Sequence, residues 1–409
     1  MSKKLVITGM GAVTPIGMGV DEYWNNLIDG KNGIGLLTRF DTTDLPVKIG
    51  AEVKGFNAED YMPKKLTREL DLFMQYAFAA AAEAIADSEI EIEPGNTGIV
   101  LGTAMNGITT VTQTVRDYEN GTVKKISPRF VPKYIGNIGA AQIAIANNIT
   151  GPSMTINTAC SSGADAISLA CMFIESGASE AMIAVGADAS LDPTIMSGLA
   201  MAKALSCDNE HPETACRPFD LNRTGFVMGE GGGALVIETE EHAKRRGAKI
   251  YAYIAGYANN TDGHHVTAPH PDGIGAIKCM EDAMLKANIQ KDEIGYINTH
   301  GTSTHSGDII ETKAIKSVFG QKAHDILISS TKSSTGHLMG AGGVTETIAC
   351  VMAVRNGIIP PTINYVTPDP ECDLNCTPNK AVKKDITAAM SNAFGFGGQN
   401  SSVIVKKYN

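Results

Sequence analysis

The sequence predicts an α/β fold, because short apolar runs alternate with amphipathic stretches along almost the whole chain. Apolar runs bounded by glycine, proline or polar residues predict strands, and apolar residues spaced three and four apart predict helices. The predicted strands span residues 5–8, 98–101, 153–157, 181–185, 234–238, 250–256, 294–298, 326–329 and 402–406. The predicted helices span residues 21–29, 70–86, 163–175, 275–287, 311–319 and 344–355. No linker rich in proline or serine separates two domains.

Composition and charge exclude several classes of protein. Of the 409 residues, 43% are hydrophobic and 19% are charged, so the chain is not intrinsically disordered. The formal net charge of −10 argues against a general nucleic-acid-binding surface. No apolar run reaches about 18 residues, so we expect no membrane-spanning helix. The 43 glycines gather in short motifs, which indicates backbone that approaches another group closely.

The eight cysteines do not have the spacing of a zinc site. The nearest pair, Cys372 and Cys376, has no second pair beside it, so we expect no metal there. These features favour an enzyme in a reducing, cytoplasmic environment.

Cys160 is the first candidate for chemistry. A predicted strand leads up to it, and the small residues at 161–163 permit a sharp turn into the next predicted helix. This pattern places a thiol at a helix N-terminus, where the helix dipole and free N–H groups favour the thiolate. The alternative is a buried structural cysteine, which is the role we expect for Cys171 and Cys350. The small polar neighbours favour a nucleophile.

Two histidines follow predicted strands in loops rich in glycine, threonine and serine. His300 lies in the motif NTHGTST, and His337 ends the motif STKSSTGH. Binding groups gather at such strand ends in open α/β sheets. Lys332 precedes His337, and Asp308 and Glu311 follow His300. A single histidine of this kind is more often a surface or capping residue, but two of them together with Cys160 indicate catalysis.

The C-terminal region holds one more glycine-rich cluster. Residues 392–400 read NAFGFGGQN and lie between two strand-like runs. They form either a glycine-rich hairpin or a flexible loop that offers a backbone N–H to an oxyanion and an aromatic gate to a pocket.

A weak internal similarity relates residues 160–171 to residues 339–350. Each segment follows a strand and a small polar loop, and each opens a predicted helix that ends near a glycine. A duplication would divide the chain into two similar halves, 1–250 and 251–409, that pack as one compact body.

Five ordered motifs resemble those of the β-ketoacyl-[acyl-carrier-protein] synthases, and among them the synthase II type most closely. They are TACSSG at 158–163, RPFDLNRTGFVMGEG at 217–231, NTHGTST at 298–304, STKSSTGH at 330–337 and AFGFGGQN at 393–400. The resemblance implies a thiolase-like fold, with duplicated βαβαβαββ halves in a five-layer α-β-α-β-α sandwich. It implies that residues 1–250 carry the nucleophilic cysteine and residues 251–409 the two catalytic histidines.

The resemblance also implies roles for the candidate residues. Cys160 would accept the acyl chain, and His300 and His337 would donate to the malonyl thioester oxygen during decarboxylation. Lys332 would orient the second histidine and pair with an acid, which we expect to be Glu311.

Further residues take supporting roles by the same resemblance. Asp308 would be an acid of the same network as Lys332. Backbone N–H groups of Cys160 and Phe396 would form an oxyanion hole, with the Phe396 side chain as the gate. Phe226 would line the malonyl side of the site.

The substrate pocket departs from the usual synthase II pattern. Residues 102–107 read GTAMNG where the family usually has GSGIGG, which places Met105 at a distal pocket position that commonly holds isoleucine. Leu199 stands where phenylalanine is common. Met105 narrows the acyl pocket and Leu199 widens it, and Thr302 and Thr304 complete the predicted pocket.

The implied reaction is a decarboxylative condensation that lengthens an acyl chain on a carrier protein, without a cofactor or a metal. The implied partner is the acyl-carrier protein, in its acyl- and malonyl-loaded forms. The basic residues expected to bind it are Lys64, Lys65, Arg68 and Lys203, although Glu69 stands where lysine is common.

Three functions fit the sequence. The first is an elongating synthase of fatty-acid synthesis, expected as a homodimer. The second is a ketosynthase of a type II polyketide or aryl-polyene pathway, which could form a heterodimer with a dissimilar subunit that lacks the cysteine. The third is a non-catalytic acyl-binding or scaffold protein, which the intact Cys160, His300, His337 and Lys332 disfavour. The pair of histidines also disfavours an initiating synthase, and the absence of a cysteine at 397–400 disfavours a thiolase.

Overall fold

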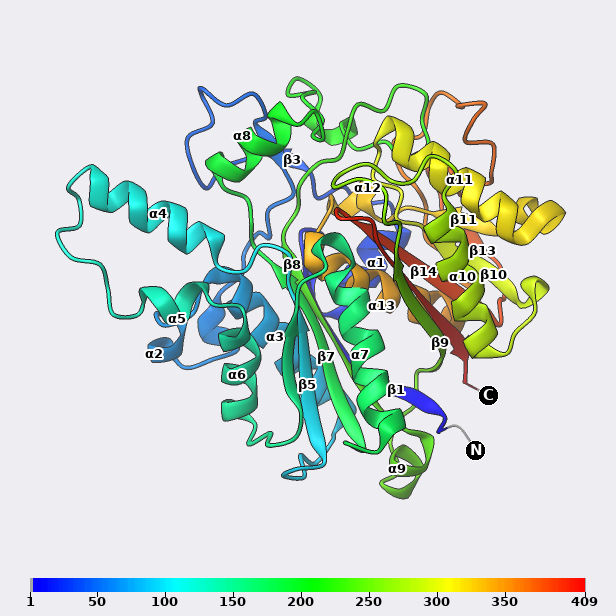
Figure 1. The fold of residues 1–409 in the computed structure, drawn as a ribbon, viewed down its shortest axis with the longest axis horizontal. Coiled ribbons are helices and arrows are strands. Elements are labelled where there is room, and N and C mark those ends of the chain that lie inside the picture. The colour runs from blue at the N-terminus through cyan, green and yellow to red at the C-terminus, as the bar shows by residue number, and fades with distance from the viewer. Residues whose placement is uncertain (1–2, 409) are drawn as a thin grey trace.

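The computed structural model describes residues 3–408, and its main strands form two groups of five (Figure 1). The first half contains β1 (Leu5–Thr14), α3 (Leu72–Ser88), β5 (Thr97–Gly102), α6 (Asn137–Ala146), β6 (Ser153–Ile156), α7 (Ser162–Ser176), β7 (Ala181–Asp188) and β8 (Gly231–Thr239). The second contains β9 (Ala252–Thr261), α10 (Ile274–Ala287), β10 (Ile294–Asn298), α11 (His305–Phe319), β11 (Leu327–Ser329), α13 (Gly342–Asn356), β14 (Ala388–Gly395) and β15 (Gln399–Lys407). Each half therefore runs βαβαβαββ.

The two halves also share one strand order in space. The order is β6-β5-β7-β8-β1 in the first half and β11-β10-β14-β15-β9 in the second, with the last strand of the path being the first in sequence. In each half the first three strands of this order run parallel, and each of the next two is antiparallel to the strand before it. This repetition of connectivity and order confirms the duplicated thiolase-like fold.

The two five-stranded sheets are continuous at one edge. β1 pairs with β8 along most of its length but with β9 at only three positions, Leu5, Val6 and Ile7. Beyond these pairs the sheets separate, and α7 and α13 pack between them. The helices α3 and α6 cover the outer face of the first sheet and α10 that of the second, with α11 packed against α10. These layers give the predicted α-β-α-β-α sandwich.

Shorter elements decorate the sandwich, several of them without a clear sequence signal. The helices are α1 (Val20–Ile28), α2 (Lys64–Thr67), α4 (Ile108–Glu119), α5 (Phe130–Tyr134), α8 (Pro193–Met201), α9 (Glu240–Arg245) and α12 (Lys332–Thr335). The short strands are β2 (Gly17–Met18), β3 (Gly35–Leu36), β4 (Ile49–Gly50), β12 (Ile358–Ile359) and β13 (Val382–Lys383). The sequence analysis did not predict α4, none of whose residues is buried. Within residues 3–408, no helix is long and apolar enough to cross a membrane.

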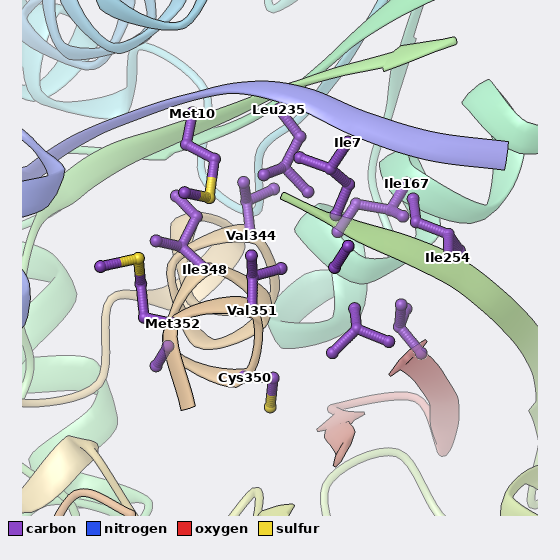
Figure 2. Packing of buried hydrophobic residues seen from close by; sticks show 14 of the residues in the cluster. Ile7, Met10, Ile167, Leu235, Ile254, Val344, Ile348, Cys350, Val351 and Met352 are labelled. Atoms are coloured by element: carbon purple, nitrogen blue, oxygen red, sulfur yellow. The ribbon is translucent and has the colours of Figure 1, made fainter. Parts of the chain in front are cut away.

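The core is densest around α13, where every residue from Gly342 to Val354 is buried. Figure 2 shows Val344, Ile348 and Val351 of this helix beneath side chains of β1 and β8, among them Ile7 and Leu235. A helix that is buried on all sides is characteristic of the centre of a layered protein. The position of α13 is therefore fixed by packing on both sheets.

Glycines let α7 and α13 approach each other closely. A Cβ atom added at Gly343 would lie 2.2 Å from the backbone nitrogen of Ala164, and one at Gly163 would lie 2.5 Å from the carbonyl oxygen of Gly340. Each helix has 15 residues and follows a short 3-10 turn whose first residue has a positive φ, 52° at Ala159 and 51° at Met339. The weak internal similarity in the sequence thus corresponds to two equivalent turns that meet in the middle layer.

We predict that Gly343→Ala lowers the free energy of unfolding by about 3 kcal/mol, because a backbone atom occupies the place of the new methyl group. Gly198→Ala in α8 is the matched control, since nothing lies within 4 Å of the added Cβ. This control should be neutral or stabilising by about 0.5–1 kcal/mol, the usual gain of alanine over glycine in a helix. Denaturant unfolding of both variants measures the difference, and equal stabilities would contradict the tight helix contact.

Candidate active site

Cys160 lies in the 3-10 turn Ala159–Ser161, between β6 and α7, where the sequence predicts it. Its side chain is buried at the inner end of a cavity of about 290 Å³. Asp165 in the first turn of α7 stabilises this turn by accepting hydrogen bonds from Thr158 Oγ1 at 2.6 Å and Ser161 Oγ at 3.1 Å. The thiol is therefore held on a rigid strand–turn–helix element and faces the cavity.

The surroundings of Cys160 act on its pKa in opposite directions. Burial raises the pKa of the thiol to about 11, and the charge of Asp188 also raises it. The backbone N–H groups of Phe396 and Cys160 and the charge of Lys332 lower it, but by less. The prediction of a thiolate favoured by the helix N-terminus is therefore wrong for the resting site, because desolvation outweighs these groups.

Both predicted histidines line the same cavity as Cys160. The ring centroids of His300 and His337 are 5.4 Å apart, and the rings are nearly perpendicular. The backbone N–H of Met339 donates to His337 Nδ1 at 3.2 Å, so the proton of that imidazole is on Nε2. Burial holds the pKa of both imidazoles well below 6.5, and the charge of Lys332 lowers both further. The cavity thus contains two neutral imidazoles.

Lys332 pairs with Glu346 of α13 and not with Glu311, which corrects the sequence prediction. Both members of the pair are buried. Glu311 instead accepts hydrogen bonds from the backbone N–H groups of His300 at 2.8 Å and Gly301 at 2.7 Å. The cause is the position of Glu311 on α11, where its carboxylate meets the backbone of the loop that follows β10.

Asp308 also supports backbone, and it forms a network separate from the Lys332 pair. It accepts hydrogen bonds from the N–H groups of Phe219 at 2.8 Å and Ser303 at 3.2 Å, and it lies 3.5 Å from Arg223 Nε. Burial raises the pKa of Asp308 to about 6 and that of Glu311 to about 7. The two acids, both on α11, therefore hold the backbone of the His300 loop.

The C-terminal glycine-rich segment closes over Cys160 as a loop between β14 and β15. A Cβ atom at Gly395 would lie 2.7 Å from the carbonyl oxygen of Thr158, so this position has room only for glycine. That contact brings the Phe396 N–H to the Cys160 thiol, and the Phe396 side chain lines the cavity. The loop is tied to the neighbouring segment by the Gly397 N–H, which donates to the Val266 carbonyl at 2.6 Å.

The predicted pocket residues divide into two groups. Phe226, Thr302 and Thr304 line the cavity, and Phe226 packs edge-on against His337 with ring centroids 5.3 Å apart. Met105 and Leu199 do not line this cavity. They border the apolar cluster that contains Cys160 and Phe226. Cys160 therefore belongs both to the lining of the cavity and to this apolar cluster.

Three of the predicted basic residues, Lys64, Lys65 and Arg68, lie on α2 or at its C-terminal end, and the fourth, Lys203, follows α8. Lys203 is exposed and lines the cavity. Lys64 and Lys65 are exposed on α2, where Lys64 lies 3.3 Å from Glu59. Arg68 lines a separate surface cleft of about 520 Å³.

The structure adds functional residues that the sequence analysis missed. Glu346 is the acid of the buried ion pair. The sequence feature that could have identified it is a single carboxylate in a mostly apolar helix. Asp188 accepts hydrogen bonds from loops distant in sequence, and no local pattern identified it. Within residues 3–408, no group of three or more His, Cys, Asp or Glu side chains is placed to hold a metal ion.

This arrangement suits acyl transfer. A thiol faces the cavity beside two N–H groups that point at its sulfur, and such groups stabilise the oxyanion of a tetrahedral intermediate. Neutral imidazoles can donate hydrogen bonds to an oxygen on which negative charge develops. The site therefore combines a covalent acceptor with donors for an enolate.

We predict that the rate at which iodoacetamide alkylates Cys160 rises about tenfold for each pH unit between about pH 7 and pH 10. Only the thiolate reacts, and the raised pKa of the thiol keeps the thiolate a minor species over this range. Peptide mass spectrometry separates this reaction from that of the exposed Cys207. A rate that reaches a plateau below about pH 8 would contradict the raised pKa.

Comparisons with known proteins find relatives that match this chain over its full length. The family models for the β-ketoacyl synthase N-terminal and C-terminal domains match residues 2–243 and 251–366. A protein of Staphylococcus aureus named 3-oxoacyl-[acyl-carrier-protein] synthase 2 is 43% identical over 410 residues, covering 100% of this chain and 99% of its own. A protein of the same name from Synechocystis sp. is 41% identical, with 99% and 98% covered.

Solved structures show the same fold. A β-ketoacyl synthase from Burkholderia phymatum superposes with a TM-score of 0.92 at 32% identity over the full length of both chains. A type II polyketide ketosynthase, solved in complex with its acyl-carrier protein, gives a TM-score of 0.92 at 31% identity, also over both full chains. Sequence, fold and site agree, and the chain belongs to the β-ketoacyl synthase family.

Proposed function

We propose that this protein is the condensing enzyme of fatty-acid elongation, a 3-oxoacyl-[acyl-carrier-protein] synthase of the synthase II type. The observation that carries the proposal is the single cavity in which the Cys160 thiol faces the neutral imidazoles of His300 and His337. The names of the relatives that are 41–43% identical over the full chain support the same activity.

The first half-reaction loads the acyl chain. Cys160 Sγ attacks the carbonyl carbon of an acyl-carrier thioester, and the resulting oxyanion accepts hydrogen bonds from the N–H groups of Cys160 and Phe396. The bond to the carrier sulfur breaks, the carrier thiolate takes the proton of the Cys160 thiol, and the carrier leaves as a free thiol. The acyl chain then extends past Met105 and Leu199.

The second half-reaction forms the carbon–carbon bond. The thioester oxygen of malonyl carrier accepts hydrogen bonds from His300 and His337 as CO2 leaves and an enolate forms. The enolate carbon attacks the acyl carbon on Cys160, the carbon–sulfur bond breaks, and the Cys160 thiolate takes up one proton. The product is a 3-oxoacyl carrier two carbons longer. Burial keeps both imidazoles neutral, and the nearby cation of Lys332, which pairs with Glu346, lowers the pKa of both further.

A ketosynthase of a type II polyketide or aryl-polyene pathway is the second candidate function. Its support is the close superposition on a type II polyketide ketosynthase, but at 31% identity against 43% for the elongating relatives. The higher identity favours fatty-acid elongation.

The proposed partners are an acyl-carrier protein and a second copy of this chain. The complex of the polyketide ketosynthase with its carrier protein supports the first. For the second, β6 ends the sheet, and α4, α5 and α6 lie beside this end of it (Figure 1). These elements and the segments between them carry the exposed apolar residues Val115, Tyr118, Ile126, Val131, Ile135, Ile145 and Met154. An open edge strand next to apolar surface favours sheet pairing between two copies.

We also propose that the protein works in the cytoplasm. All eight cysteines are free thiols, including the exposed Cys207, and such thiols persist in a reducing compartment.

We predict that saturated acyl-carrier thioesters load Cys160 of the wild-type chain, with a preference for one range of chain length set by the pocket around Met105 and Leu199. Mass spectrometry of the Cys160 peptide after exposure to a graded series measures both the adduct and the preference. Cys160→Ala should form no adduct and no 3-oxoacyl product. An adduct or product with that variant would contradict the mechanism, and loading by only unsaturated or aryl starters would favour the second candidate function.

We predict that Lys203→Glu raises KM for carrier substrates about tenfold at low salt with little change in kcat, because an exposed charge at the cavity mouth acts on encounter with an acidic carrier. Arg68→Glu should act in the same direction. Lys291→Glu is the matched control, since this exposed lysine precedes β10 and His300 follows the opposite end of that strand. Unchanged kinetics for Lys203→Glu at low salt would count against carrier docking at this residue.

A further inference from the structure

Asp188, the last residue of β7, has every acceptor position of its carboxylate occupied. Oδ1 accepts from Thr103 Oγ1 and from the Met105 N–H, both at 3.0 Å. Oδ2 accepts from the Ala104 N–H at 2.8 Å and the Gly340 N–H at 2.6 Å. A carboxylate offers about four such positions, so this buried group is fully used by two chain segments distant in sequence.

The first segment is the loop after β5 that carries Met105. Two consecutive N–H groups, those of Ala104 and Met105, donate to Asp188, and the Thr103 hydroxyl that donates to it also accepts from the Asn106 N–H at 3.2 Å. This one carboxylate therefore anchors residues 103–105 of the loop. The Met105 side chain packs against the apolar cluster that contains Cys160. By anchoring the loop, Asp188 therefore determines the position of Met105 beside that cluster.

The second segment is the turn between His337 and α13. The Met339 N–H donates to the His337 imidazole, and the next N–H, that of Gly340, donates to Asp188. A Cβ atom at Gly340 would lie 2.5 Å from Asp188 Oδ2 and 2.8 Å from the Ala104 nitrogen. The turn that orients the imidazole and the loop that carries Met105 therefore meet at Asp188.

We propose that Asp188 is a positioning residue that sets the chain-length preference of the enzyme, by fixing Met105 against the acyl chain and joining its loop to the His337 turn. This inference rests on the proposed function, since it presumes an acyl chain on Cys160. Asp188 touches no reacting atom in this role and acts through the two segments that it holds.

The test is a double-mutant cycle on the loading of Cys160 by saturated acyl-carrier thioesters of graded length. Asp188→Asn keeps the shape but puts an NH2 group against two N–H donors, so the loop relaxes and Met105 withdraws. We expect the ratio of loading rates, preferred chain over a chain four carbons longer, to fall about tenfold. In the Met105→Ala background, Asp188→Asn should change this ratio less than twofold.

Asp220→Asn is the matched control. Asp220 is also buried and accepts hydrogen bonds from the N–H groups of Asn222, Val366 and Thr367, but it lines no part of the cavity. This variant should lose stability while the loading ratio stays as in the wild type. If Asp188→Asn does not fold, Thr103→Val removes one donor to Asp188 and should lower the ratio in the same direction, by about threefold.

Each outcome decides between the alternatives. An unchanged ratio in Asp188→Asn, or an equal fall in the presence and absence of the Met105 side chain, would overturn the inference and leave the proposed function intact. A wild-type chain that forms no acyl adduct at all would overturn the proposed function and this inference together.

Discussion

The close contact between α7 and α13 is the constraint on which the site depends. Glycines at 163 and 343 remove the side chains that would separate these helices, so their N-terminal turns meet in the middle layer. Cys160 lies in one turn and His337 directly precedes the other, and the contact therefore assembles the thiol and the imidazole. Both helices present the positive end of their dipole to this place, which favours an oxygen that becomes negative. The duplicated fold thus creates the geometry that the condensation needs.

Burial then determines the charge state of the site before reaction. It raises the pKa of the Cys160 thiol and lowers that of both imidazoles, so these three groups are neutral. The cation of Lys332 is matched by Glu346 next to it. Negative charge that develops on a substrate oxygen then meets oriented N–H donors. A neutral imidazole also donates a hydrogen bond without delivering its proton to the enolate carbon, which preserves the nucleophile for condensation.

The sequence predicted the parts of the site that lie on local motifs, and missed contacts between distant segments. The turn at Cys160 and the strand-end position of His300 follow from short patterns of small residues, and the structure has them there. His337 instead follows the short helix α12, which the sequence did not predict between it and β11. The prediction that Lys332 pairs with Glu311 was wrong. It relied on the position of Glu311 close to His300 in sequence, whereas Glu346 reaches Lys332 only through the packing of α13. The prediction of a favoured thiolate at Cys160 was wrong for a related reason. A helix N-terminus can be predicted from a sequence, but the burial that raises the pKa of the thiol cannot. The duplicated strand order appeared in the sequence only as one weak similarity.

The same geometry separates the two tasks of the enzyme in space. The groups proposed for decarboxylation lie on the loop after β10 and on the segment that follows α12, while the residues proposed to contact the acyl chain lie on the loop after β5 and on α8. Changes to the side chains at 105 or 199 alter the volume beside Cys160 without moving the histidines, provided that the backbone of the 103–107 loop stays in place. Since Asp188 is the hydrogen-bonding link from this loop to the His337 turn, its carboxylate lets the pocket vary in size while the catalytic geometry stays constant. A change at Asp188 itself releases both segments together, so chain-length preference and the orientation of His337 are independent only while that carboxylate is present.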